Sequence, residues 1–288
     1  MTTATITTRR QLLEGIPATE RRLELAGIST PVLDGGRGSP MVLLHGPGEH
    51  AAKWVEVIPR LVENHRVIAP DLPGHGASVV TGGPLTAERV LQWMDELIDR
   101  TCSSPPVLVG QVVGGAIAMR YAIRHGERLG RLILVDTLGL VPFEPTPEFA
   151  SVLHAFLADQ NEATFNALWG RCAFDLDRLR SRMGDRWTAY ASYTLERARS
   201  AEVQAAQGAL LEQFGFAPIP PDELARIAVP TALIWGRHDL ATSVAVAEAA
   251  SARYGWPLYV IEDAADDPGL EQPERFVEAV LAIRGSSQ

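Results

Sequence analysis

Short runs of valine, isoleucine and leucine alternate along this chain with longer segments of helical character. The runs are continuously apolar, which is typical of strands covered on both faces of a sheet, and they occupy residues 41–44, 67–69, 107–109, 132–135, 232–235 and 258–261. In residues 87–99, apolar side chains recur at spacings of three and four, and helices are also predicted at residues 51–62, 115–125, 241–254 and 271–284. Strand, helix, strand in this order predicts a mainly parallel sheet with helices on both faces.

The chain begins differently from the rest. Residues 22–26 and 29–33 alternate apolar and polar side chains and are followed by Asp34-Gly35-Gly36, so a hairpin is predicted there. Residues 1–20 are predicted to be a loose extension or a short cap strand. The twin-arginine pattern at residues 8–13 is rejected as an export signal, because no apolar segment follows it.

The alternation of strands and helices lapses in residues 143–221. This region is rich in arginine, tryptophan and alanine and is flanked by prolines. Core strands resume after it, so it is predicted to be an inserted helical lid. The core is then formed by residues 1–142 and 222–288, with residues 1–20 as an N-terminal extension.

Charge and composition exclude several classes of partner. The 288 residues carry a net charge of -9, which gives no electrostatic footprint for nucleic acid or an anionic membrane. Two cysteines, Cys102 and Cys172, are too few for a disulfide framework, and no apolar stretch is long enough to cross a membrane. We therefore expect a cytoplasmic protein whose partner is a small molecule, with no metal and no cofactor.

Five loops carry recognisable motifs, in a consistent order. Residues 45–48 read His-Gly-Pro-Gly after an apolar run, and residues 71–78 read Asp-Leu-Pro-Gly-His-Gly-Ala-Ser. Residues 110–115 place Gly-Gln-Val-Val-Gly-Gly between a strand and a helix, the context of a nucleophile elbow. Residues 236–239 and 263–274 complete the set. In these motifs the chain resembles the α/β-hydrolase superfamily.

The resemblance extends over about residues 22–285. It implies an α/β-hydrolase fold: a mainly parallel, eight-stranded sheet flanked by helices, with an inserted helical lid. Loops at the carboxyl ends of parallel strands are where ligands bind in open α/β sheets, so the motif loops are the expected site.

The chemistry of the family's triad is missing at the matching positions. Val112 occupies the position of the nucleophile and has no nucleophilic atom. Asp266 occupies the position of the histidine, and only the acid position, Asp239, keeps its usual residue type. Pro47 has no N–H where the family's loop commonly offers one to an oxyanion, although the amide of Val113 remains. Ordinary Ser-His-Asp hydrolysis is therefore not expected.

Asp239 and Asp266 are the predicted catalytic residues. Two adjacent carboxyls cannot both ionise easily, so one pKa would rise and the pair would act as acid and base. The alternative is that the shorter aspartate leaves a gap filled by water and the pair is vestigial. Asp136, after the run at 132–135, is a reserve acid or the cap of a turn with Thr137.

The predicted substrate-binding residues are Gly46, Pro47, His50, Gln111, Val112, Val113 and Asp136. His50 is a candidate for the pocket mouth. Asp267 is expected to be solvated, the two cysteines inert, and Lys53, the single lysine of the chain, exposed on a helix. The lid aromatics are assigned to the core in preference to the pocket; they are Phe156, Phe165, Trp169, Trp187, Tyr190 and Tyr193.

These features predict a non-hydrolytic enzyme of the lyase, isomerase or cyclase type. Its expected substrate is an apolar, polyketide-like or polycyclic intermediate of specialised metabolism, transformed by proton transfer through Asp239 and Asp266. Two alternatives stay open: a small-molecule-binding protein without activity, and a hydrolase in which Asp266 activates water. The sequence does not identify the substrate or the oligomeric state.

Overall fold

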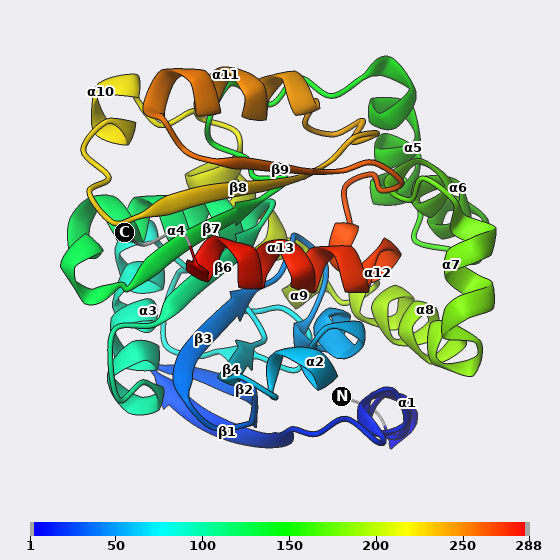
Figure 1. Cartoon of the computed structure of the whole chain (residues 1–288). Helices are drawn as coiled ribbons and strands as arrows, with labels where there is room; N and C mark the ends of the chain where they lie inside the picture. The colour runs from blue at the N-terminus through cyan, green and yellow to red at the C-terminus, as the bar shows by residue number, and fades with distance from the viewer. Residues whose placement is uncertain (1–2, 286–288) are drawn as a thin grey trace.

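A mainly parallel sheet forms the centre of the molecule in the computed structural model, which describes residues 3–285 (Figure 1). Its strands are β1 (Thr19–Leu25), β2 (Ile28–Gly35), β3 (Ser39–Leu44), β4 (His65–Pro70), β5 (Val79–Val80), β6 (Val107–Gln111), β7 (Arg131–Val135), β8 (Thr231–Gly236) and β9 (Leu258–Ile261). Eight of them follow the order β1-β2-β4-β3-β6-β7-β8-β9, and β5 pairs with β2. The pairs β1–β2, β2–β4 and β2–β5 are antiparallel, and the others are parallel.

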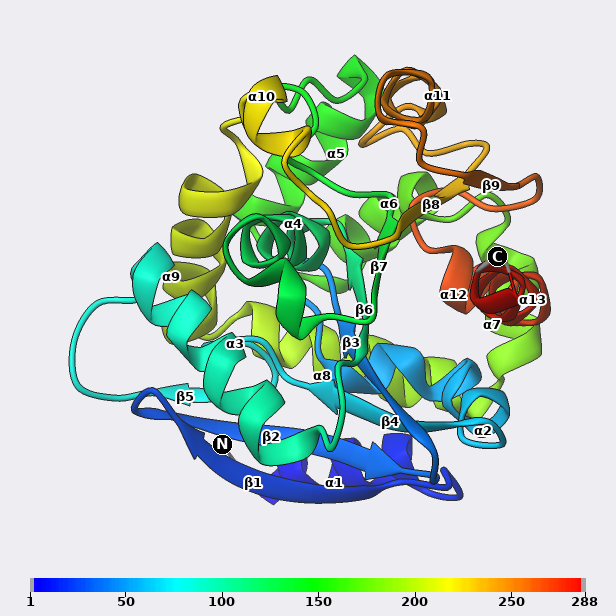
Figure 2. The ribbon, with the colours of Figure 1, turned by 60° about the vertical axis from the view of Figure 1, so that its left-hand side comes forward.

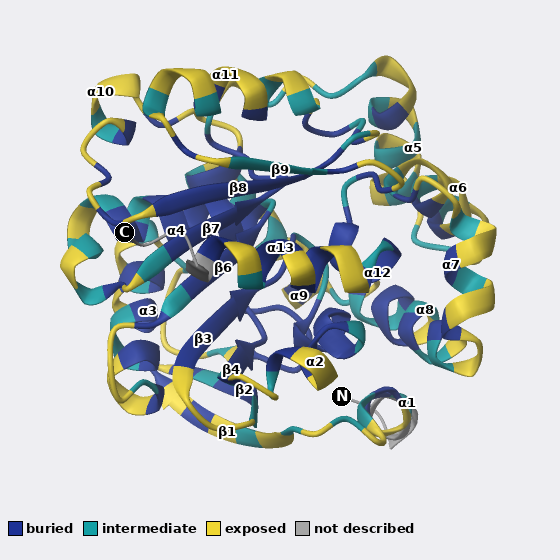
Figure 3. Cartoon of the chain, in the orientation of Figure 1, coloured by how far each residue is buried: buried dark blue, intermediate teal, exposed yellow. Residues whose placement is uncertain are grey.

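The predicted parallel α/β architecture is confirmed. The six apolar runs all become parallel strands, and the predicted hairpin is β1–β2, with Leu25 opposite Ile28. The expected count was eight strands; the two-residue β5 adds a ninth in the described part of the chain. The middle strands are buried on both faces (Figure 3), which explains their continuous apolar sequence.

Helices cover both faces of the sheet (Figure 2). One face packs against α3 (Ala87–Thr101), α4 (Val113–His125), α10 (Pro221–Leu224) and α11 (Val244–Tyr254). The other packs against η1 (Ala51–Glu56), α2 (Ile58–Leu61) and α13 (Pro273–Gly285). The single helix predicted at residues 51–62 is thus two short helices, with Pro59 in the first turn of α2. None of the described helices is long and apolar enough to cross a membrane.

Further helices lie between β7 and β8, beyond the carboxyl ends of the strands (Figure 1). They are α5 (Pro147–Ala158), α6 (Glu162–Cys172), α7 (Leu176–Met183), α8 (Asp185–Ala198), α9 (Ala201–Leu210) and η3 (Leu211–Gly215). The short η2 (Gly126–Arg128) and α12 (Pro268–Glu271) complete the described elements. The region predicted as a lid is therefore helical, and aromatic side chains of α6 and α8 form a small apolar cluster of their own.

The N-terminal segment differs from the expectation of a loose extension or strand. Thr3–Leu13 form α1, which packs against α8 and η1, and Leu12 is fully buried. Arg9 fixes this helix: its Nη2 lies 3.0 Å from Asp71 Oδ2 and its Nη1 donates to the Tyr193 hydroxyl at 3.1 Å. Asp71 is fully buried and also accepts the amide of Ala51. The helix thereby supplies the counter-charge for a buried carboxylate.

Removing Arg9 should therefore destabilise the protein strongly. Arg9→Ala leaves Asp71 as an uncompensated buried charge, which is expected to cost about 3 kcal/mol of unfolding free energy. Its neighbour Arg10 is exposed, so Arg10→Ala should change the unfolding free energy by less than about 0.5 kcal/mol. Denaturant titration of both variants measures the difference, and equal small losses would contradict the buried ion pair.

Candidate active site

The turn between β6 and α4 has the backbone of a nucleophile elbow. Val112 has φ of 48°, a left-handed conformation that is strained for a β-branched residue by about 1–3 kcal/mol. The glycines around it allow close packing: a Cβ on Gly114 would lie 2.6 Å from His45 O, and one on Gly115 2.2 Å from Thr137 Oγ1. The elbow geometry is thus present, while the side chain at its tip is a valine.

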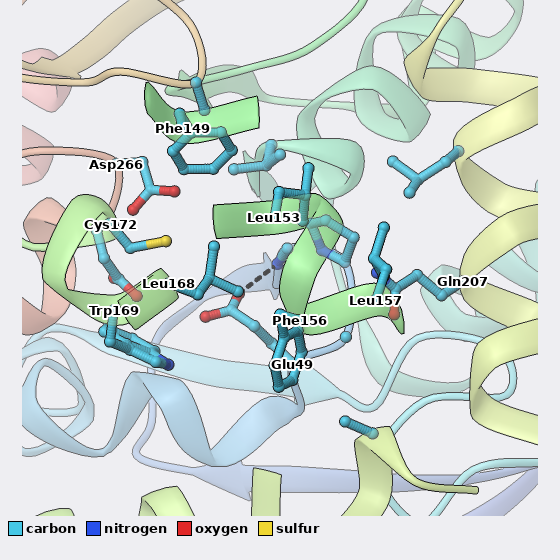
Figure 4. A pocket seen from close by; sticks show the side chains of 18 of the residues that line it. Glu49, Phe149, Leu153, Phe156, Leu157, Leu168, Trp169, Cys172, Gln207 and Asp266 are labelled. Carbon is cyan, nitrogen blue, oxygen red and sulfur yellow. Dashed lines mark hydrogen bonds between the residues drawn. The ribbon is translucent and has the colours of Figure 1, made fainter. Parts of the chain in front are cut away.

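A cavity of about 240 Å³ lies above this turn (Figure 4). Four of the predicted binding residues line it: Gly46, Pro47, Gln111 and Val112. Most of the remaining wall is apolar and comes from the lid, including Phe149, Leu153, Phe156, Leu157, Phe165, Leu168 and Trp169. The cavity therefore suits a small, largely apolar ligand.

The other three predicted binding residues do not line the cavity. Val113 is buried at the start of α4, and Asp136 is buried after β7. His50 is fully buried, with its Nε2 3.1 Å from Thr194 Oγ1 and its ring against Tyr190 and Tyr193. The expectation that His50 faces the pocket mouth is not met, because the packing of α8 covers it.

Asp239 is paired with Asp136 instead of Asp266. Its Oδ1 accepts the amides of Ala241 and Thr242, at 2.7 and 2.9 Å, and Asp136 Oδ1 accepts the amide of Gly236 at 2.9 Å. The remaining oxygen of each carboxyl is buried without another donor. Burial raises the pKa of Asp239 to about 7, and burial together with the Asp239 charge raises the pKa of Asp136 well above its usual value. One proton shared by the two carboxyls would satisfy both oxygens.

Asp266 is the predicted catalytic residue that reaches the cavity (Figure 4). Its main chain is fixed, since its amide donates to Cys172 O at 3.2 Å and its carbonyl accepts Gln111 Nε2 at 2.7 Å. The carboxyl side chain contacts the Cys172 thiol and, within the described residues, accepts no hydrogen bond from an N–H group and forms no ion pair, although the Lys53 charge acts on it from a greater distance. Burial raises the pKa of Asp266 well above its usual value, and the charge of Asp239 adds to the effect.

Glu49, Lys53 and Asp267 form an ionic cluster that the sequence analysis missed. Lys53 Nζ lies 3.3 Å from Glu49 Oε2 and 3.1 Å from Asp267 Oδ1. Glu49 also accepts the amide of Gly46 at 2.7 Å and the Tyr190 hydroxyl at 3.2 Å. Burial raises the pKa of Glu49 to about 7, although the Lys53 charge acts in the opposite direction. Both acidic residues line the cavity.

Two expectations are wrong in this cluster. Lys53 was expected to be exposed and Asp267 solvated, yet only 1% of Lys53 and 3% of Asp267 is exposed. The reason is that η1 is covered by α1 and α12, two contacts between segments far apart in sequence. The four-residue spacing of Glu49 and Lys53 was the one local signal of an ion pair.

The lid residues divide between cavity and core. Cys172, expected to be inert, lines the cavity beside Asp266, and burial together with that carboxyl raises its pKa, so it remains a thiol. Of the six lid aromatics assigned to the core, five are buried in one apolar cluster: Phe165, Trp169, Trp187, Tyr190 and Tyr193. Phe165 and Trp169 also line the cavity, as does the partly buried Phe156. Across residues 3–285, no group of three histidine, cysteine or acidic side chains is placed to hold a metal ion.

Comparison with known proteins agrees with this architecture. The family model described as the alpha/beta hydrolase family matches residues 41–279. The chain belongs to the alpha/beta hydrolase family.

Related proteins of this family are hydrolases. The chain is 27% identical over 272 residues to the 2-hydroxy-6-oxo-6-(2'-aminophenyl)hexa-2,4-dienoic acid hydrolase of Metapseudomonas resinovorans, covering 92% of this chain and 90% of that protein. It is 30% identical over 254 residues to the pimeloyl-[acyl-carrier protein] methyl ester esterase of Aeromonas hydrophila, covering 85% of this chain and 95% of that protein.

A solved structure supports the fold alone. Carboxylesterase CesB from Bacillus subtilis superposes with a TM-score of 0.83 at 19% identity, covering 99% of this chain and 98% of that one.

These comparisons correct the predicted function. The relatives are enzymes, which supports an enzymatic role, but they are named as hydrolases. The prediction of a non-hydrolytic lyase, isomerase or cyclase acting on a polyketide-like intermediate is therefore wrong, as is that of a binding protein without activity. The inference failed because the missing serine was taken to favour non-hydrolytic chemistry over hydrolysis with Asp266 as the base.

The raised pKa values of Asp136 and Asp239 make stability depend on pH. A carboxyl whose pKa is raised in the folded state stabilises the fold at low pH, and this contribution is lost as pH rises through the folded pKa, which is about 7 for Asp239. The melting temperature should thus fall between pH 5 and pH 8. In Asp239→Asn an amide donor takes the place of the proton at every pH, so the loss of unfolding free energy over this pH range should be smaller by about 1 kcal/mol or more.

Thermal unfolding at a series of pH values tests this expectation. Asp222→Asn is the matched control, because Asp222 is exposed, and this variant should follow the wild-type curve. A pH dependence that is the same in Asp239→Asn and in the wild type would disprove the shared proton.

Proposed function

We propose that the protein hydrolyses a small, largely apolar ester, with Asp266 as the general base that activates water. The hydrolase names of its relatives support the reaction class, and the esterase matches over 95% of its own length. The apolar wall of the cavity, at the tip of the elbow, supports the character of the substrate.

The observation that carries this proposal is the freedom of the Asp266 carboxyl. Glu49 is held by the Gly46 amide and Lys53, and Asp267 is held by Lys53. Asp266 faces the same cavity with only a thiol beside it. A carboxylate without a strong partner is the one that can accept a proton from a bound water.

The reaction then proceeds in two steps. The water oxygen bonds to the ester carbonyl carbon while its proton passes to Asp266, which produces a tetrahedral oxyanion. The carbon–oxygen bond to the alcohol breaks next, and the proton returns from Asp266 to the departing alkoxide. Because Val112 has no nucleophilic atom, no acyl-enzyme forms at the elbow.

Stabilisation of the oxyanion is limited in this site. The backbone N–H of Val113 lies in the first turn of α4, at the positive end of the helix dipole. An N–H in this position has no partner within the helix and is the kind of group that donates a hydrogen bond to an oxyanion. Pro47 has no N–H, and the Gly46 amide is bonded to Glu49. Loss of one donor typically costs about 3 kcal/mol of transition-state stabilisation, so turnover should be slow.

The charge of the cavity favours an ester over a dienoic acid. Dienoic acid substrates, named for the Metapseudomonas relative, carry a carboxylate. The lining of the cavity here includes Glu49, Asp266 and Asp267 and no arginine, lysine or histidine. Like charges repel strongly in such a buried setting, so an anionic substrate is disfavoured.

Substitution of Asp266 should remove the activity. With neutral nitrophenyl esters of short acids, Asp266→Asn should lower kcat by about 100-fold or more, because the amide cannot accept a proton. Asp263→Asn, on the same loop with an exposed side chain, should retain wild-type kcat. Cys172→Ala should also retain activity, and full activity in Asp266→Asn would refute the proposed role.

Activity should also rise with pH. The base acts only when ionised, and burial with neighbouring acidic groups raises the pKa of Asp266 well above its usual value. The groups that raise it are Asp239, Asp267, Glu271 and Glu49. A profile of kcat/KM from pH 5 to pH 9 should rise with pH, whereas a flat profile over that range would indicate a base with an ordinary carboxyl pKa.

A further inference from the structure

We propose that the cavity selects ligands in which a positively charged nitrogen, an ammonium group, is joined to a small apolar group. The inference rests on the proposed function only in taking the same cavity as the binding site. It names the substrate class: an ester or related compound that carries a protonated amine.

The first argument is the balance of charge around the cavity. Three carboxyls line it, Glu49, Asp266 and Asp267, and no basic side chain does. The buried ammonium of Lys53 lies between Glu49 and Asp267 and contacts both. Lys53 forms ion pairs with two of the three carboxyls, and Asp266 is the member without an ion pair. A ligand ammonium would supply the missing positive charge.

The second argument is an unsatisfied acceptor on the cavity wall. Gln111 is 2% exposed and lines the cavity. Its Nε2 donates to the carbonyl of Asp266 at 2.7 Å, which leaves Oε1 as the free end, and this oxygen is buried without a donor. A buried acceptor without a partner costs about 1–3 kcal/mol. A ligand N–H beside Asp266 would satisfy this oxygen once the Gln111 amide turns to meet it.

The third argument is the aromatic lining of the same cavity. Rings from the lid and its flanking segments surround the cavity: Phe143, Phe149, Phe156, Phe165, Trp169 and Phe216. Aromatic faces attract cations through their quadrupole, most strongly where water is excluded. The same rings contact the apolar part of a ligand. The volume of about 240 Å³ limits that part to a small group.

An ammonium ligand would also affect the proposed catalysis. A cation beside Asp266 favours its ionised form, because opposite charges stabilise each other. Binding would therefore lower the pKa of Asp266 and favour its carboxylate form, the form that acts as a base. Selection of the substrate and activation of the base would have the same physical cause.

Calorimetric titration of the whole protein at pH 7 tests the inference with three probes of similar size. These are phenethylammonium, phenethyl alcohol and phenylacetate, which place a cation, a neutral group and an anion beside the same ring. Phenethylammonium should bind about tenfold tighter than the alcohol, and phenylacetate should bind weakest. Equal affinities, tightest binding of phenylacetate, or no binding of any probe at millimolar concentration would each overturn the proposal.

Two variants locate the charge that is responsible. Asp266→Asn should weaken phenethylammonium binding about tenfold and leave the affinity for the alcohol within about twofold. Asp263→Asn, the exposed control on the same loop, should leave all affinities unchanged. If Asp266→Asn does not fold, Glu49→Gln provides a second test of the preference for phenethylammonium. An unchanged preference in both variants would refute the proposal that these carboxyls select the cation.

Failure of this inference is distinguishable from failure of the proposed function. The titrations require no turnover, whereas hydrolysis is measured with neutral esters. A protein that hydrolyses neutral esters without preferring the ammonium probe would retain the proposed function and lose only the substrate class.

Discussion

Burying a carboxyl group in an apolar interior costs free energy unless the group gains a cation, a proton or several N–H donors. The structure uses cations and N–H donors in this way close to the cavity. Asp71 has Arg9 and backbone amides, Asp239 accepts two backbone amides, and Lys53 lies between Glu49 and Asp267. Within the described residues the Asp266 carboxyl has no ion pair and no N–H donor, and for that reason the proposed chemistry and the proposed ligand both centre on it.

At the elbow the chain keeps the backbone geometry of the family but lacks the reactive side chain that the family usually has there. Val112 keeps a positive φ angle, and the glycines of α4 still pack closely against the neighbouring loop and the turn after β7. This strained conformation is supported by packing alone, since the side chain has no reactive atom. The frame that normally aims a nucleophile here forms the floor of a cavity, and the reactive groups are the carboxyls around its wall.

Local patterns were sufficient to predict most of the fold. Continuous apolar runs marked all the parallel strands, and the motif loops placed Gln111 and Asp266 at the cavity. The exceptions depend on contacts between distant segments: the burial of Lys53 follows from the packing of α1 and α12 on η1, and the Asp136–Asp239 pair follows from the meeting of two loops. The Arg9 contacts that fix α1 are equally non-local. The spacing of residues along the chain does not show which distant segments will pack together. The function was mispredicted because the missing nucleophile was taken to favour non-hydrolytic chemistry over hydrolysis with Asp266 as the base.

The buried ammonium of Lys53 has a practical consequence for work with this protein. It is the single lysine of the chain, and it is 1% exposed, so the folded surface presents no lysine side chain. Amine-directed dyes and crosslinkers will find no lysine to modify until the region around η1 opens. The rate at which an amine reagent modifies Lys53 therefore reports how readily the structure around η1 opens locally.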